Sequence, residues 1–165
     1  MFNFFKKQPG FSIIEVIAVI FIIAVGLTGI LSLIVQNIQA QYINKNALIA
    51  SQLAQEGLEL IRNVRDENWL ATPAIWAFSS IAEEDGSKLF AIDFDGMTSV
   101  DSSSLKIDTD YYLHSGSADS GFSRIIQTEN NHLASSTVVS CIVEWKEKKG
   151  GEHKYVAETV LYDWR

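Results

Sequence analysis

The residue best placed to take part in chemistry is Glu15, a carboxylate at the N-terminal edge of a long apolar run. The run, residues 16–35, contains 20 residues and no charged side chain. An ionised carboxylate at the edge of such a segment is costly and is a functional candidate by default. Its chemistry would be charge pairing, because an ammonium group and a carboxylate offset each other's desolvation penalty. The alternative is an ordinary glutamate at a membrane interface.

The element that carries Glu15 has the length of a transmembrane helix. A helix of 20 residues spans about 30 Å, the thickness of a bilayer core. Lys6 and Lys7 precede the run, and the next charged residue after Glu15 is Lys45. The positive-inside bias therefore places residues 1–10 in the cytoplasm and the rest outside it. The sequence predicts a single-pass protein of the cytoplasmic membrane.

An ordinary secretory signal explains these residues poorly. Such a signal has a basic region, a short apolar region and then a small-residue cleavage site. Here Gly10 lies before the apolar run, and no site of that kind follows it. Cleavage after Gly10 would therefore leave the hydrophobic segment on the mature chain.

Residues 10–16, with the sequence Gly-Phe-Ser-Ile-Ile-Glu-Val, and the apolar run after them resemble the type IV prepilin family. This family includes pilins, minor pilins and the pseudopilins of type II secretion. The resemblance implies cleavage between Gly10 and Phe11 by a prepilin peptidase, N-methylation of Phe11, and assembly into an extracellular or periplasmic filament. The implied partners are other pilin or pseudopilin subunits, the peptidase/methyltransferase and an inner-membrane assembly platform.

Cleavage would give Glu15 a possible partner, because it would free an α-amino group at Phe11 that is mostly cationic near neutral pH. Within one chain, Glu15 can approach its own N-terminus and the positive end of the helix dipole. Between subunits, it would neutralise the amine of the next chain and set the axial register. We expect Glu15→Ala to permit cleavage and to impair assembly.

Length and charge bound the remaining chain. The protein has 165 residues and a net charge of −7. Removal of residues 1–10 takes away two of the 13 basic residues and no acidic residue. The mature chain would then have 155 residues and a net charge of −9. The acidic balance argues against direct nucleic-acid binding, which needs clustered Lys and Arg. One cysteine, Cys141, permits no intrachain disulfide and is expected to pack as a small hydrophobe. A reactive or intermolecular role for this thiol is the alternative.

The predicted fold class is α+β, with a long N-terminal helix packed against a C-terminal antiparallel β-sheet. The helix is expected over residues 11 to 68, about 85 Å in length. Residues 11–40 form its hydrophobic half and residues 41–68 its amphipathic half, and residues 69–165 form a globular head. In the amphipathic half, small and apolar residues recur at helical spacing. This stripe, expected to face the head, consists of Ile43, Ala47, Ala50, Ala54, Leu58, Ile61 and Val64.

Three glycines interrupt the predicted helix. Gly26, Gly29 and Gly57 each weaken it by up to about 1 kcal/mol relative to Ala. Gly26 and Gly29 are either soft points of the membrane half or places where helices approach closely. Residues 50–65 look more like minor pilins and minor pseudopilins than major pilins.

Period-two alternation predicts strands at residues 121–129, 136–146 and 153–162, with a hairpin turn at 148–151. Short strands are expected at 88–94 and 111–114, loops at 98–110 and 115–121, and a helix break at Thr72-Pro73. Trp76 and Phe78 are expected core anchors. The predicted core face of the second strand consists of Val139, Cys141, Val143 and Trp145, although Val138 and Ile142 on the other face are also apolar.

No residue set has the pattern of an enzyme site. His114, His132 and His153 are widely spaced, and the serines lack a nucleophile-elbow pattern. Asp93 and Asp95 are weak calcium candidates, because the EF-hand spacing and its terminal Glu are absent. An acidic turn is the alternative. The sequence therefore predicts no catalytic residue and no cofactor.

Three classes of function remain. The favoured class is a structural subunit, a minor pilin or pseudopilin of a type IV pilus-like or type II secretion-like filament. The second is a membrane-tethered or filament-tip binding protein, such as an adhesin or DNA-uptake subunit, that acts through the head loops. The third is a membrane-anchored enzyme, for which no site is evident. A mature N-terminus at Phe11 would separate the first two classes from the third.

Overall fold

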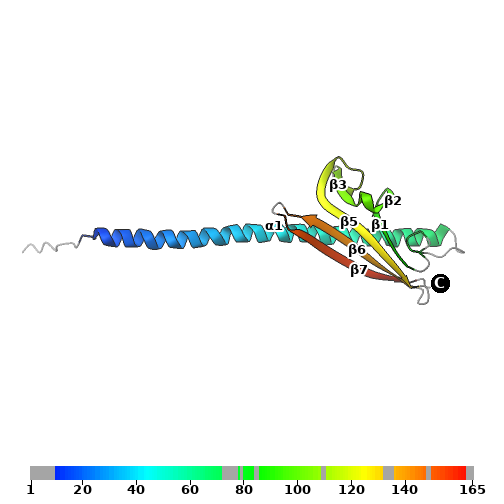
Figure 1. The fold of residues 1–165 in the computed structure, drawn as a ribbon, viewed down its shortest axis with the longest axis horizontal. Coiled ribbons are helices and arrows are strands. Elements are labelled where there is room, and N and C mark those ends of the chain that lie inside the picture. The colour runs from blue at the N-terminus through cyan, green and yellow to red at the C-terminus, as the bar shows by residue number, and fades with distance from the viewer. Residues whose placement is uncertain are drawn as a thin grey trace, which may run out of the picture. The chain divides into compact units, whose positions relative to one another are not determined.

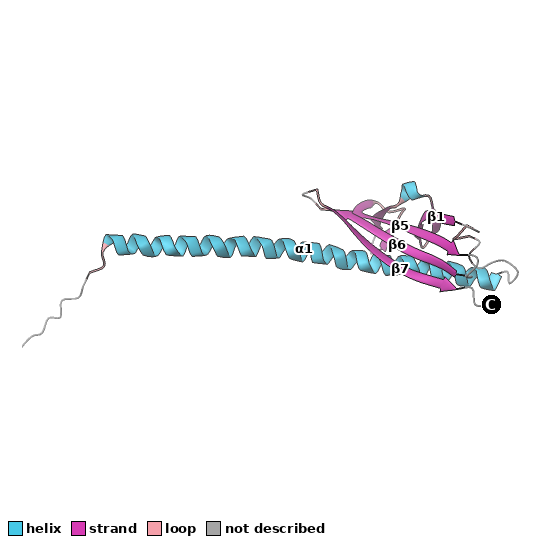
Figure 2. Cartoon of the chain, turned by 60° about the horizontal axis from the view of Figure 1, so that its bottom comes forward, coloured by secondary structure: helices cyan, strands magenta, loops and turns pink. Residues whose placement is uncertain are grey.

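The fold is α+β: one long helix precedes an antiparallel sheet (Figures 1 and 2). A computed structural model describes residues 10–71, 78, 80–83, 86–108, 111–131, 136–147 and 150–162. The chain divides into two compact units, Met1–Asn44 and Lys45–Arg165. The predicted break at Thr72-Pro73, the core anchor Trp76 and His132 lie outside the described residues.

Helix α1 spans Ile13–Ala71, which confirms the predicted helix to within two or three residues at each end. Ser12 directly precedes the helix, and its carbonyl oxygen accepts hydrogen bonds from the backbone N–H of Glu15 at 3.0 Å and of Val16 at 3.2 Å. Every side chain of residues 11–44 is exposed. By length and composition, the apolar part of α1 is sufficient to cross a membrane.

The second half of α1 packs against the sheet through the predicted stripe. Ala50, Ala54, Leu58 and Ile61 are buried, and Ala47 and Val64 are partly buried against the same core. The prediction was wrong for Ile43, which is 36% exposed because it precedes the compact unit that begins at Lys45.

The described part of the sheet has seven strands. The strands are β1 (Gly86–Asp93), β2 (Gly96–Thr98), β3 (Ser104–Asp108), β4 (Tyr111–Leu113), β5 (Ala118–Asn131), β6 (Ser136–Lys146) and β7 (Glu152–Tyr162). The order β2-β1-β5-β3-β4 runs along one path, and β6 lies between β5 and β7. All of the pairs are antiparallel.

The long strand β5 organises this sheet. On one side, the first half of β5 pairs with β3 and its second half with β1. On the other side, β5 pairs with β6 over most of the length of β5. β5 curves strongly (Figure 1). Gly121 of this strand has φ +76°, a conformation that favours glycine. The pairing of β3 with β5 also shifts register between Leu105 and Lys106, which is typical of a bulge.

The predicted strands at 88–94, 111–114, 121–129, 136–146 and 153–162 are all present, with small differences at their ends. The predicted turn between β6 and β7 is confirmed at Gly150 and Gly151, where Gly151 accepts a hydrogen bond from the Glu147 N–H at 2.8 Å. The other two residues of that turn, Lys148 and Lys149, lie outside the described residues.

The two loop predictions were wrong in part. Residues 98–110 contain a 3₁₀ turn, η1 (Val100–Ser102), and strand β3, and residues 118–121 already belong to β5. β3 pairs with the start of β5, and the side chain of Leu105 in β3 is fully buried. Partner strands therefore impose an extended conformation on polar segments that have little strand propensity of their own.

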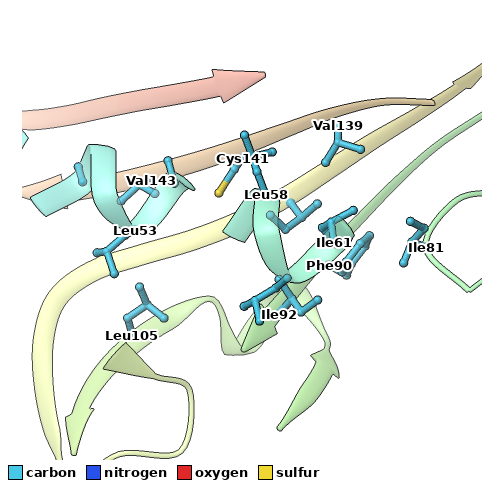
Figure 3. Close-up of a cluster of buried hydrophobic side chains, with 14 of the residues drawn as sticks. Leu53, Leu58, Ile61, Ile81, Phe90, Ile92, Leu105, Val139, Cys141 and Val143 are labelled. Carbon is cyan, nitrogen blue, oxygen red and sulfur yellow. The ribbon is translucent and has the colours of Figure 1, made fainter. Parts of the chain in front are cut away.

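One core fills the space between the second half of α1 and the sheet. Figure 3 shows Leu53, Leu58 and Ile61 of α1 among side chains of β1, β3 and β6. The predicted core face of β6 is confirmed, because Val139, Cys141, Val143 and Trp145 are all buried, and Phe78 is buried as well. This hydrophobic cluster lies entirely within residues 47–161. The second unit therefore has a complete core without residues 11–44.

Candidate processing and assembly site

The candidate site is the short segment in front of α1 together with the first helical turns. Gly10 and Phe11 are both exposed, and Phe11 is 83% accessible. Apart from its neighbours in the chain, no described residue has an atom within 4 Å of the position that a Cβ on Gly10 would occupy. The Gly10–Phe11 peptide bond therefore lies in open chain before the helix, where an enzyme can reach it.

Glu15 lies in the first turn of α1. Phe11, Glu15, Val16, Val19 and Ile20 together line a shallow recess on this end of the helix. The carboxylate lies near the positive end of the helix dipole, which favours a negative charge. Its hydrogen-bonding capacity is unused among the described residues, so the group is free to pair with an incoming cation.

In the uncleaved chain, the nitrogen of Phe11 is part of a peptide bond and carries no charge. Cleavage after Gly10 would convert it into an ammonium group four residues before Glu15. The two groups would then be exposed on the same helix end, with an apolar segment next to them. The arrangement can therefore form a charge pair only after processing.

The weak calcium candidates have different surroundings. Asp93 is buried, and its carboxylate accepts hydrogen bonds from the backbone N–H of Asp95 and of His114, both at 2.9 Å. Asp95 is exposed, and Ser115 Oγ donates to it at 3.4 Å. Asp93 thus holds the β1–β2 turn against the end of β4. Within the described residues no three His, Cys, Asp or Glu side chains are grouped to hold a metal ion.

Sequence reasoning missed a buried charge in the head. Arg124 on β5 is fully buried. Its guanidinium donates to the carbonyl oxygens of Leu53 at 3.2 Å and Ile92 at 2.7 Å, and it forms an ion pair with Glu56 at 3.1 Å. Arg124 therefore ties α1 to β1 and β5. The signal that marked it was strand alternation, because Phe122 and Ile126 on either side face the core.

Gly57 and Cys141 lie beside this arginine. A Cβ on Gly57 would be 2.8 Å from Cys141 Sγ and 3.2 Å from Arg124 Cδ. Burial raises the pKa of the Cys141 thiol to about 12, although the positive charge of Arg124 opposes part of that rise. The thiol is thus protonated and inaccessible, as expected for a packed hydrophobe.

The exposed Gly10–Phe11 bond, the first-turn Glu15 and the apolar part of α1 adjoin one another in the chain. Residues 5–31 match the family described as the prokaryotic N-terminal methylation motif. The chain therefore carries the type IV prepilin signature, in agreement with the resemblance seen in the sequence. No significant match exists among curated proteins or solved structures.

Proposed function

We propose that this protein is a structural subunit, a minor pilin or pseudopilin, of a type IV pilus-like or type II secretion-like filament. The observation that carries this proposal is the methylation motif over residues 5–31, with an exposed Gly10–Phe11 bond directly before an apolar helix. The precursor is held in the cytoplasmic membrane by the first part of α1. A prepilin peptidase cuts after Gly10, and Phe11 becomes the methylated N-terminus.

Assembly is driven by the exposed apolar side chains of α1. Residues 13–44 lack a packing partner within the described chain, so in water they would aggregate and in a filament they would bury one another. Other pilin or pseudopilin subunits supply the apolar surface against which these side chains pack, and an inner-membrane platform delivers the subunits. The head, which has its own core, then lies outside the cytoplasm.

Glu15 sets the axial register of this assembly. An unpaired carboxylate inside an apolar filament core is costly, whereas a carboxylate paired with the ammonium group of a neighbouring Phe11 is tolerated. A subunit shifted along the filament would leave both charges unpaired. The pair therefore selects one axial position among many that apolar packing alone would accept.

The proposal is tested by expressing the full chain with a prepilin peptidase and a filament assembly system. Mass spectrometry is expected to find a mature chain that begins at methylated Phe11. Gly10→Ala should block this cleavage. Glu15→Ala should be cleaved normally but be lost from sheared filaments. Glu59→Ala, at an exposed position on α1, is the matched control for removing a carboxylate from the same helix.

Two results would contradict the proposal. A mature chain that retains Met1, or one cleaved beyond residue 30, is incompatible with prepilin processing. Normal incorporation of Glu15→Ala into filaments would show that charge pairing does not set the register.

A further inference from the structure

Strand β7 is an edge of the sheet. It pairs with β6 along all 11 of its residues without a register shift, and the described strands offer no partner on its other side. Such an edge presents unpaired backbone N–H and C=O groups, which proteins usually protect by short strands, proline, bulges or lysines. β7 contains no proline or bulge and a single lysine, Lys154. The edge is therefore competent to accept another strand.

An apolar surface reaches this edge on the sheet face turned away from α1. Ile125 of β5, Ile142 of β6 and Val156 of β7 are directly paired across three strands. Val156 is 48% exposed and Val160, on the same face, is 43% exposed. Ile142, which blurred the alternation in the sequence, belongs to this row. A strand added beside β7 would extend the row and cover Val156.

Two opposite charges flank Val156 on that face. Lys154 lies two residues before it and Glu158 two residues after it. Lys154 Nζ is 4.0 Å from Glu144 Oε1, and Ser140 Oγ donates to Glu158 at 3.2 Å, both at the exposed surface. Neither charge is buried, so both remain available to a partner. The pattern Lys-x-Val-x-Glu is complementary to itself when the strand direction is reversed.

We propose that β7 pairs antiparallel with β7 of a second copy of this chain, about a two-fold axis at Val156. In this register Val156 faces its counterpart, and each Lys154 lies opposite Glu158 of the other copy. Opposite charges in directly facing positions stabilise antiparallel pairs, whereas like charges destabilise them. The complementary charges of Lys154 and Glu158 therefore identify β7 of a second copy as the strand that pairs at this edge.

Other two-fold registers that pair most of β7 satisfy the charges less well. A two-fold axis perpendicular to the sheet keeps facing residues on one face, so the centre moves in steps of one residue along β7. A centre at Tyr155 places Glu152 opposite Glu158, and a centre at Glu158 places that carboxylate opposite its own copy. A centre at Ala157 places Glu158 opposite Val156. The centre at Val156 avoids each of these.

This contact is separate from the filament contacts proposed above. A two-fold interface closes on itself and does not propagate, so it lies outside the repeating contacts of a polar filament. Its failure would leave the roles of Gly10, Phe11 and Glu15 untouched.

Cysteine cross-linking in the full chain tests the register. Directly facing residues of an antiparallel pair have Cα atoms about 4.5–5.5 Å apart, within disulfide range. Val156→Cys is expected to form a disulfide-linked dimer under mild oxidation in membranes. Ile142→Cys, one strand inward on the same face, is the matched control and should remain monomeric. The buried Cys141 leaves the unmodified chain unlinked.

Two cross-linking results would overturn the proposal. Faster dimer formation by Ala157→Cys than by Val156→Cys would reject the register. Equal cross-linking of Val156→Cys and Ile142→Cys would show random collision rather than strand pairing.

Charge reversal tests the recognition in the fragment of residues 45–165, which has a complete core. Sedimentation is expected to show a dimer whose dissociation constant rises at least about tenfold in Lys154→Glu or in Glu158→Lys, because each change creates two like-charge pairs. The variant with both changes restores opposite charges and should dimerise like the unmodified head. Both positions are exposed, and circular dichroism checks the fold.

A head that stays monomeric at every concentration would overturn pairing between copies. A dimer that is indifferent to both single reversals would show that another surface forms the contact.

Discussion

Gly57 is the position where a single methyl group tests how α1 docks on the sheet. The residue is buried, and a Cβ at this position would approach Cys141 Sγ to 2.8 Å, Arg124 Cδ to 3.2 Å and Ile126 Cδ1 to 3.3 Å. A contact below 3.0 Å is not tolerated, so the Cys141 side chain must rotate or α1 and β6 must move apart. We therefore expect Gly57→Ala to destabilise the head.

The magnitude follows from two opposing effects. Overpacking a core by a methyl group costs about 1–3 kcal/mol. Alanine is favoured over glycine in a helix by about 0.8–1.0 kcal/mol. The steric cost is the larger, so the free energy of unfolding should fall by about 1 kcal/mol, within a range of roughly 0–2 kcal/mol.

The obstacle can be removed by a second change. Cys141→Ala deletes the sulfur that makes the closest contact, and the next atom is 3.2 Å away. In this background Gly57→Ala should be neutral or stabilising by up to about 1 kcal/mol, because the helix preference is retained. The coupling energy between the two changes should be about 1–2 kcal/mol, as expected for residues in contact.

Urea unfolding of residues 45–165, followed by tryptophan fluorescence, measures these free energies. Asn63→Ala on the exposed side of α1 is the control for helix preference alone and should stabilise by no more than about 0.7 kcal/mol. The reasoning fails if Gly57→Ala stabilises the head as this control does. It also fails if the cost of Gly57→Ala is unchanged when Cys141 is replaced.

Two further predictions concern the same buried region. Arg124→Ala should lower the free energy of unfolding by about 3–5 kcal/mol, because it removes the buried partner of Glu56 and the donor to Leu53 and Ile92. Urea unfolding measures this change. A loss of less than about 1 kcal/mol, the size expected for an exposed ion pair, would contradict the prediction. Cys141 has a pKa raised from 9.0 to about 12 by burial. Between these pH values the unfolded chain loses the thiol proton while the native chain keeps it, so stability should fall by up to about 1.4 kcal/mol per pH unit. Cys141→Ala should show a shallower decline in urea unfolding from pH 8.5 to 11, and equal slopes would refute the assignment.

Local patterns were sufficient to predict most of the secondary structure. The helical spacing of Ala50, Ala54 and Leu58 and the alternation around Val139 and Cys141 are properties of neighbouring residues, and the structure confirms both. Strand β3 was missed because its conformation depends on pairing with β5, which lies far along the chain. A Ser- and Asp-rich segment has no local preference that would reveal such pairing.

The segment from Gly10 to Glu15 could be found from the linear order of residues alone. A peptidase acts on open chain and a bilayer responds to length and hydropathy, so neither property needs a folded head. The sequence by itself therefore determined the prepilin signature and the apolar helix.

Only the tertiary structure decided the roles of Arg124, Gly57 and β7. Strand alternation places Arg124 on the core face, but neither an arginine in a strand nor a glycine in a helix has a local feature that names its buried partners. Both residues are buried because α1 lies against β5 and β6. There Arg124 supplies the charge that pairs with Glu56, and Gly57 leaves room for the sulfur of Cys141. The open edge of β7 depends on which strands pair with it, and pairing between distant segments is a property of the folded sheet.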